Sequence, residues 1–246
     1  MLPATLCPMD WREIPYEIWR RSTAVQPTPQ WQLIAALGAV ALLVVASPMW
    51  SAVRMLATIT HEGGHALVAL LTGRRLTGIK LNRDTSGVTL SRGRPGGAGM
   101  IATLLAGYPA PALTGLAAAL LLGSGRAVGM LWLAVLLLGA MLLLMRNLYG
   151  IVVVLGLGAV VVALTWTLPE VWLSWIGYGV CWLLLWSAPR PVIELARHPE
   201  RGSDVDQLAR LTRVPRILWL TFFVLLTMAA VAAGVWLLLP LEQFVG

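Results

Sequence analysis

TITHEGGHAL, residues 58–67, places two histidines and a glutamate inside a stretch that is otherwise apolar. The apolar stretch runs from 51 to 72, about the 20 residues that an α-helix needs to cross a bilayer. Ionisable side chains at membrane depth cost free energy, and where they occur they usually have a function. The stretch therefore predicts a membrane helix with a functional site built into it.

The composition of the chain agrees with a membrane protein. Of 246 residues, 58% are hydrophobic and 12% are charged, and the mean hydropathy is +0.79, outside the usual range of soluble domains. The net charge of +7 does not indicate nucleic-acid binding, because the basic residues flank apolar runs instead of forming a basic patch. Two distant cysteines support neither a zinc knuckle nor a disulfide framework. We expect the lipid bilayer as a partner and no nucleic acid.

Seven apolar runs are long enough to cross a membrane. They lie at roughly 31–49, 51–72, 99–122, 127–145, 150–167, 171–188 and 215–239. We therefore expect an all-α polytopic membrane protein with about seven transmembrane helices, or six if two runs merge. With seven spans, four segments share one side of the membrane: 1–30, 73–98, 146–149 and 189–214. These segments hold most of the 18 Lys and Arg residues, so the positive-inside rule predicts that they are cytoplasmic, the N-terminus included.

The expected domain organisation is simple. A cytoplasmic or interfacial segment at 1–30 leads into a single membrane-embedded domain at 31–239, and a tail at 240–246 follows. Two cytoplasmic segments, 76–93 and 189–214, are long enough for structure of their own.

Both of these segments show patterns of regular structure. Apolar and polar residues alternate on either side of the turn sequence DTSG, residues 84–87, which predicts a β-hairpin directly after the HEGGH helix. Further on, Ser203 and Asp206 match a capping box and are followed by apolar residues at helical spacing. This pattern predicts a short surface helix before the last span.

The HEGGH motif has the spacing of a metal site. His61 and His65 are four residues apart, so on a helix both imidazoles lie on one face, one turn apart, as two ligands of one metal ion must. Zinc suits two imidazoles and a carboxylate, and a catalytic site keeps a further position open for water. Glu62 is placed to act as general base on that water and then as acid to the leaving amine. Gly63 and Gly64 would let another backbone or a substrate strand approach the metal closely.

The third protein ligand must come from elsewhere in the chain. Asp204 is the first candidate and Asp206 the reserve, because both lie on the expected cytoplasmic side at the start of a helix that leads into the last span. The alternative is that they only cap that helix. His198 is a weaker candidate, since a lone histidine in a basic loop is more often solvated. Asn147, at a helix end on the same side, is a candidate to hydrogen-bond a substrate backbone or the oxyanion.

With these features the chain resembles the site-2 protease family of intramembrane zinc metalloproteases. The resemblance covers roughly 31–239 and rests on HEGGH in a span, a cytoplasmic hairpin after it, GYPAPALTG at 107–115 and a late acidic motif. The sequences SDVDQLARLTRVP at 203–215 and RNLYG at 146–150 place the resemblance with a compact bacterial branch that carries Ser-Asp before the final span. One departure is that the chain has no Asp-Gly pair, in which the better-known members present the third ligand.

The resemblance implies zinc held by His61, His65 and a distal aspartate, with Glu62 as catalytic base, in a bacterial inner membrane. It also implies a transmembrane or membrane-associated protein substrate that unwinds and pairs as a strand with a sheet edge, for which the strands around Ile79 and Val88 are candidates. The alternative function is a membrane scaffold or carrier that retains a structural or relic metal site. Only the protease predicts that Glu62→Gln keeps the metal and loses cleavage.

Overall fold

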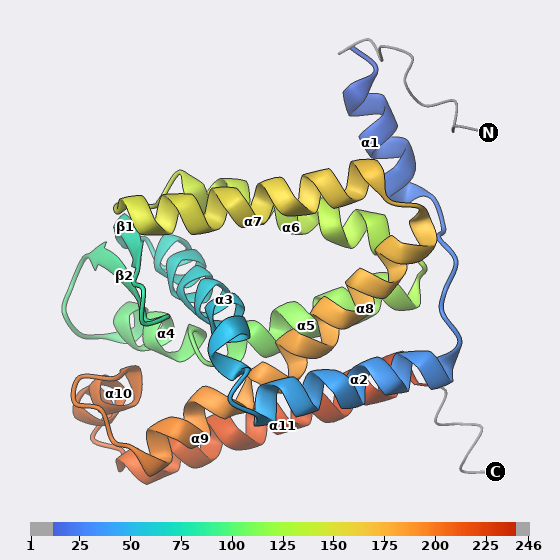
Figure 1. Ribbon diagram of the computed structural model, residues 1–246. Coiled ribbons are helices and arrows are strands. Elements are labelled where there is room, and N and C mark those ends of the chain that lie inside the picture. Colours follow the sequence, from blue (N-terminus) through green and yellow to red (C-terminus); the bar gives the residue numbers. More distant parts are fainter. Residues whose placement is uncertain (1–11, 240–246) are drawn as a thin grey trace, which may run out of the picture.

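Long helices make up most of the computed structural model, which describes residues 12–239 (Figure 1). The elements are α1 (Ile14–Thr23), α2 (Trp31–Ala46), α3 (Trp50–Leu71), β1 (Arg75–Leu81), β2 (Gly87–Arg92), α4 (Ala98–Ala106), α5 (Pro109–Gly123), α6 (Ala127–Leu142), α7 (Leu148–Thr167), α8 (Glu170–Ser187), α9 (Pro189–Arg197), α10 (Asp204–Thr212) and α11 (Arg216–Leu238). The expected tail at 240–246 and the first part of the segment 1–30 lie outside the described residues.

Three helices are each long and apolar enough to cross a membrane: α7, α8 together with α9, and α11. Two further candidates are bent pairs, α2 with α3 at 98° and α4 with α5 at 61°, and α6 is a shorter apolar helix. By length and composition the described chain therefore has three candidate spans, or up to five if each bent pair is one span. The structure therefore supports a multi-span helical protein, with fewer candidate spans by this criterion than the seven expected.

Prolines account for both bends. Pro48 disfavours helical geometry in the residue before it, and Ser47 is extended with ψ 176°, so the runs expected as two spans at 31–49 and 51–72 meet as one bent pair. Pro109, in the next bent pair, has no N–H for the helical bond to the carbonyl four residues earlier. The helix accordingly stops at Ala106 and restarts at Pro109.

The described part of the N-terminal segment, residues 12–30, and the hairpin lie at opposite ends of the helical body (Figure 1). The Gln26 backbone N–H donates to the Gly125 carbonyl at 2.8 Å, and the Gln26 side chain accepts from the Val128 N–H at 3.1 Å. At the same end, the Arg21 guanidinium donates to the Thr165 carbonyl at 2.7 Å. The prediction that the N-terminal segment shares a side with the hairpin is therefore corrected: α2 starts at the far end and runs toward the hairpin.

The predicted β-hairpin is confirmed. Strands β1 and β2 pair antiparallel, with Ile79 opposite Thr89. The other edge of β1 is covered by the chain between α6 and α7, where the Ile79 N–H donates to the Leu144 carbonyl at 2.8 Å and the Arg146 N–H donates to the Ile79 carbonyl at 2.9 Å. In the part of the chain that the structure describes, β2 has a strand on one side only. The hairpin therefore has one closed and one open edge.

The short helix predicted before the last span is also present, as α10. Its apolar face is fully buried at Val205 and Leu208, which pack with Leu104, Tyr108 and Phe223 in one cluster. This cluster joins α10 to the α4–α5 junction and to α11. Since α4 and α5 also pack against α3, the cluster holds α10 in place beside α3.

Candidate metal centre

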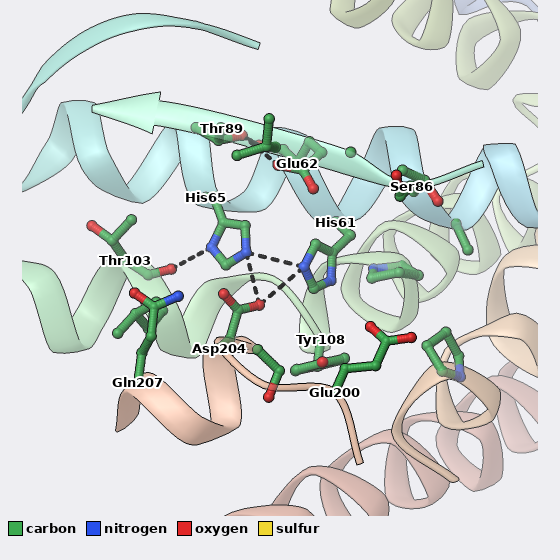
Figure 2. A pocket seen from close by; sticks show the side chains of 18 of the residues that line it. His61, Glu62, His65, Ser86, Thr89, Thr103, Tyr108, Glu200, Asp204 and Gln207 are labelled. Atoms are coloured by element: carbon green, nitrogen blue, oxygen red, sulfur yellow. Dashed lines mark hydrogen bonds and ion pairs between the residues drawn. The ribbon is translucent and has the colours of Figure 1, made fainter. Parts of the chain in front are cut away.

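The two motif histidines face the same point beside α3 (Figure 2). Their spacing of four residues brings the rings onto one helix face, and the two Nε2 atoms lie 3.0 Å apart. Glu62, between them in sequence, is turned toward the hairpin and is only 4% exposed. The helix thus presents two imidazoles to one side and a buried carboxylate beside them.

Asp204 completes the cluster from α10. Its Oδ2 lies 3.1 Å from Nε2 of His61 and 3.1 Å from Nε2 of His65. The capping role that was the alternative for Asp204 is taken by Ser203, whose hydroxyl accepts from the Asp206 N–H at 3.3 Å. Burial alone would raise the pKa of Asp204, but the facing imidazoles, in their protonated form, hold the pKa of this carboxyl below its usual range.

The break between α4 and α5 supplies a partner for His65. The last carbonyls of a helix have no intrahelical partner, and the carbonyl of Thr103, in the last turn of α4, lies 2.6 Å from His65 Nδ1. Because a carbonyl can only accept, Nδ1 carries the proton, and in the neutral ring Nε2 then keeps its lone pair. A metal-ligating histidine is oriented by this kind of partner.

Glycines allow the close approach of α3 to this break. A Cβ at Gly107 would lie 2.5 Å from His65 Nε2 and 2.6 Å from His61 Cε1, and a Cβ at Gly64 would lie 2.7 Å from the Ala106 carbonyl oxygen. Gly64 therefore lets the backbone of the α4–α5 junction come near the histidines. The approach of another backbone was one of the two uses expected for the motif glycines, and the approach of a substrate strand was the other. A Cβ at Gly63 would instead meet only Met141, whose sulfur would be 3.5 Å away.

Strand β2 lies over Glu62 (Figure 2). The Thr89 hydroxyl is 2.7 Å from Glu62 Oε2 and 3.0 Å from the Glu62 carbonyl oxygen. A cavity of about 360 Å³ opens between the hairpin, α3, the α4–α5 junction and the loop into α10, and His61, Glu62, His65 and Asp204 all line it. The cluster is thus accessible from this cavity.

Three other candidates from the sequence lie outside the cluster. Asp206 accepts from the Gly202 N–H at 3.1 Å and forms an ion pair with Arg216 at 2.9 Å. The Asn147 amide is paired with the backbone of Leu81, from which it accepts at 3.2 Å and to which it donates at 2.6 Å. His198 is not in the group of possible ligands found among residues 12–239.

The donor set fits a zinc ion. Ligand atoms about 2.0–2.2 Å from a tetrahedral zinc lie roughly 3.3 Å from one another, close to the separations of 3.0 and 3.1 Å between the three atoms here. The three atoms that face one another are two imidazole nitrogens and a carboxylate oxygen, and each can donate a lone pair. One shared cation would accept all three lone pairs. His61, His65 and Asp204 could therefore hold one metal ion.

Sequence reasoning missed the residues that support this cluster. Thr103 acts through its backbone carbonyl, which carries no residue-specific signal, although the prolines of GYPAPALTG mark the helix break that frees it. Gly107 begins that same sequence. The alternating pattern of β2 did not indicate Thr89 either, because its apolar positions, Val88 and Leu90, are exposed and the polar Thr89 faces inward.

Comparison with known proteins agrees with the geometry of the site. The search of curated proteins and the search of solved structures returned no match. The family described as Peptidase M50B-like matches residues 33–234, which include the HEGGH helix, the hairpin, the α4–α5 break and α10. Since the match spans most of the chain, the protein belongs to the Peptidase M50B-like family and is a site-2-protease-like metallopeptidase.

Proposed function

We propose that the protein is an intramembrane zinc endopeptidase that hydrolyses peptide bonds of membrane-protein substrates. The observation that carries the proposal is the meeting of His61 Nε2, His65 Nε2 and Asp204 Oδ2 beside the buried carboxylate of Glu62. Those three residues would hold the zinc. Family membership supports a metal-dependent peptidase, and the apolar helices support a membrane setting.

Glu62 would be the general base and acid of the reaction. Zinc bound here would polarise the scissile carbonyl and make a water molecule more acidic. The Glu62 carboxylate then accepts a proton from water and returns it to the leaving amine. Thr103 keeps the lone pair of His65 directed at the cluster through the bond from Nδ1. None of these residues needs a soluble domain to position it.

The substrate would bind as an extended strand along β2. A transmembrane helix must unwind before it is cut, and the exposed backbone can then pair with a sheet edge. Of the two edges expected to serve this purpose, the one at Ile79 is closed by the bonds to Leu144 and Arg146. The edge of β2 that contains Val88 is open among the described residues, and β2 borders the cavity.

The membrane arrangement that fits the structure has six crossings. They are the bent pair α2–α3, the bent pair α4–α5, the short helix α6, and then α7, α8 and α11. An even number of crossings agrees with Figure 1, in which α1 and the end of α11 lie at the same end. The loops 73–98 and 189–214, at the other end, hold most of the 18 Lys and Arg residues. We therefore place the hairpin and the cavity mouth on the cytoplasmic side of a bacterial inner membrane.

The test combines zinc content with cleavage in detergent. The test substrate is a single-span peptide with a proline in its transmembrane segment, because Pro weakens the helix and eases unwinding. We expect about one zinc per chain and cleavage for wild type, and loss of both for His65→Ala and Asp204→Ala. We expect Glu62→Gln to keep zinc and lose cleavage.

The variants also separate the proposal from its rival. A Glu62→Gln protein that cleaves as well as wild type would overturn the proposed chemistry. A folded wild type that binds no zinc after supplementation would contradict the metal site itself. Zinc binding without cleavage of a panel of such peptides would favour the scaffold or carrier function.

A further inference from the structure

We infer that Thr89 is a positioning residue that holds the carboxylate of Glu62 in place from the hairpin. The inference rests on the proposed function, since it concerns the residue proposed as general base. Thr89 lies on strand β2, 27 residues after Glu62. It therefore links the base to a structural element that the HEGGH motif does not contain.

The contact is short and the carboxylate is buried. The Thr89 hydroxyl lies 2.7 Å from Glu62 Oε2, and Glu62 is 4% exposed. Among residues 12–239, Thr89 is the one side chain that hydrogen-bonds this carboxylate. Removing the hydroxyl would leave a buried acceptor without its partner, and that is more costly than losing a solvated bond.

The inward face of β2 is shaped around Glu62. Side chains on a strand alternate between its faces, so Gly87 and Thr89 share the face toward α3. A Cβ at Gly87 would lie 2.7 Å from Glu62 Cγ and 2.8 Å from Glu62 Oε1. The glycine thus leaves room for the glutamate at the position where the threonine, two residues later, provides the hydrogen bond.

The strand that carries Thr89 is itself held firmly. Thr89 pairs with Ile79 on β1, and the backbone of Ile79 is bonded on its other side to Leu144 and Arg146. Because the strand is fixed in this way, the hydrogen bond from the Thr89 hydroxyl restricts the rotamers that the Glu62 side chain can adopt. The open edge of the same strand is the proposed docking edge for substrate, so β2 would align the substrate and the base together.

A positioning role predicts an effect on turnover more than on substrate affinity. We expect Thr89→Val to lower kcat by about 10- to 100-fold, the usual effect of losing a residue that supports a catalytic or metal-binding group. KM and the zinc content should stay near the wild-type values. We expect Thr89→Ser, which keeps the hydroxyl, to recover most of the turnover.

The matched control is Thr77→Val in the same hairpin. The Thr77 hydroxyl donates to the Leu90 carbonyl at 2.9 Å and does not line the cavity. If the loss in Thr89→Val came only from a weakened hairpin, Thr77→Val would lose turnover to the same degree. Equal losses in the two variants would therefore overturn the inference, as would a Thr89→Val protein with wild-type kcat or a Thr89→Ser protein as slow as Thr89→Val.

A second readout does not depend on turnover. Acetohydroxamate chelates zinc in peptidases and shares a proton with the general base, so its affinity reports how the Glu62 carboxylate is placed. We expect weaker binding to Thr89→Val and near wild-type binding to Thr89→Ser and Thr77→Val, by calorimetry on the zinc-loaded proteins.

If wild type binds zinc and cleaves nothing, the proposed function fails, but this affinity series still decides the role of Thr89. Should Thr89→Val not fold, Thr89→Ala, which also lacks the hydroxyl, must show the same loss at unchanged zinc content.

Discussion

Helices α3 and α10 bring together the two halves of the cluster in different ways. Helix α3 carries His61, Glu62 and His65 within five residues, so one regular helix sets their relative positions. Helix α10 carries only Asp204, which meets His65 across 139 residues of chain. The first half follows from local geometry, whereas the second half depends on how a separate helix docks.

The two halves also differ in what holds them. The histidines of α3 lie against backbone and rings, with no room for a methyl group at Gly107. Helix α10 is held by a buried apolar face and, at its polar edge, by the ion pair of Asp206 with Arg216. Adding volume to a close-packed site forces neighbouring side chains and backbone to move together. A helix held at its edge by an ion pair can instead shift by a small amount when that ion pair is weakened. We therefore expect abrupt effects from changes beside α3 and graded effects from changes at α10.

The largest effect is expected for Gly107→Ala. The backbone of Gly107, at φ −64° and ψ −65°, accepts alanine without strain, so only the added methyl group matters. That group would lie within 2.6 Å of atoms in both histidine rings, and both rings must move apart from Asp204. We expect zinc content to fall to the level of His65→Ala, measured by elemental analysis.

Gly139→Ala is the control for this change. A Cβ at Gly139, in α6, would meet nothing within 4 Å, so this variant should keep its zinc. Full zinc content in Gly107→Ala would show that the histidines are not held by packing, and the contrast between the two halves of the site would be lost.

A smaller, graded effect is expected for Asp206→Asn. The change removes the charge that pairs with Arg216 at 2.9 Å and weakens the hold on the start of α10. We expect the zinc Kd to rise about tenfold, at the lower end of the effect of losing a supporting residue, with about one zinc per chain still bound at saturation. A competition titration with a chelator measures this shift.

The partner residue provides the control. Arg216→Met also loses the bond from Arg216 to the Leu195 carbonyl, so it should raise the Kd at least as much as Asp206→Asn. The double variant should be no worse than Arg216→Met alone, because both changes remove the same ion pair. If Asp206→Asn abolished zinc binding as Asp204→Ala does, Asp206 would be a ligand and the roles of the two aspartates would be reversed.

The sequence was sufficient for the local elements. Period-two alternation around the DTSG turn predicted the hairpin, and helical spacing of Val205 and Leu208 predicted the buried face of α10. Alternation and helical spacing are each properties of a single element, so they can be read without knowledge of the rest of the fold. The alternation did not, however, tell which face of β2 is inward, since its apolar residues Val88 and Leu90 are exposed. The i, i+4 spacing of His61 and His65 was readable for the same reason.

The number of spans and the side of the N-terminus could not be read in this way. Hydropathy gives the length of an apolar run but not its direction, so the bend at Ser47 and Pro48 was not distinguished from a turn between two spans. The choice between Asp204 and Asp206 had a similar cause. Both are acidic residues in the first turn of one helix, and only the docking of that helix decides which one faces the histidines.

The smallest effect is expected for Gly202→Ala, where the chain enters α10. Gly202 has φ +83°, in the left-handed region, where a Cβ costs about 1 kcal/mol, equivalent to about a fivefold change in an equilibrium constant. Since Gly202 also donates its N–H to Asp206 at 3.1 Å, a distorted entry would misplace the first turn that carries Asp204. We expect the zinc Kd to rise about fivefold or less.

Gly202→Asn should raise it by less than Gly202→Ala, because asparagine tolerates left-handed geometry better. Equal shifts in the two variants would show that the side chain, and not the backbone conformation, is responsible, and α10 would then be as sensitive to added volume as α3.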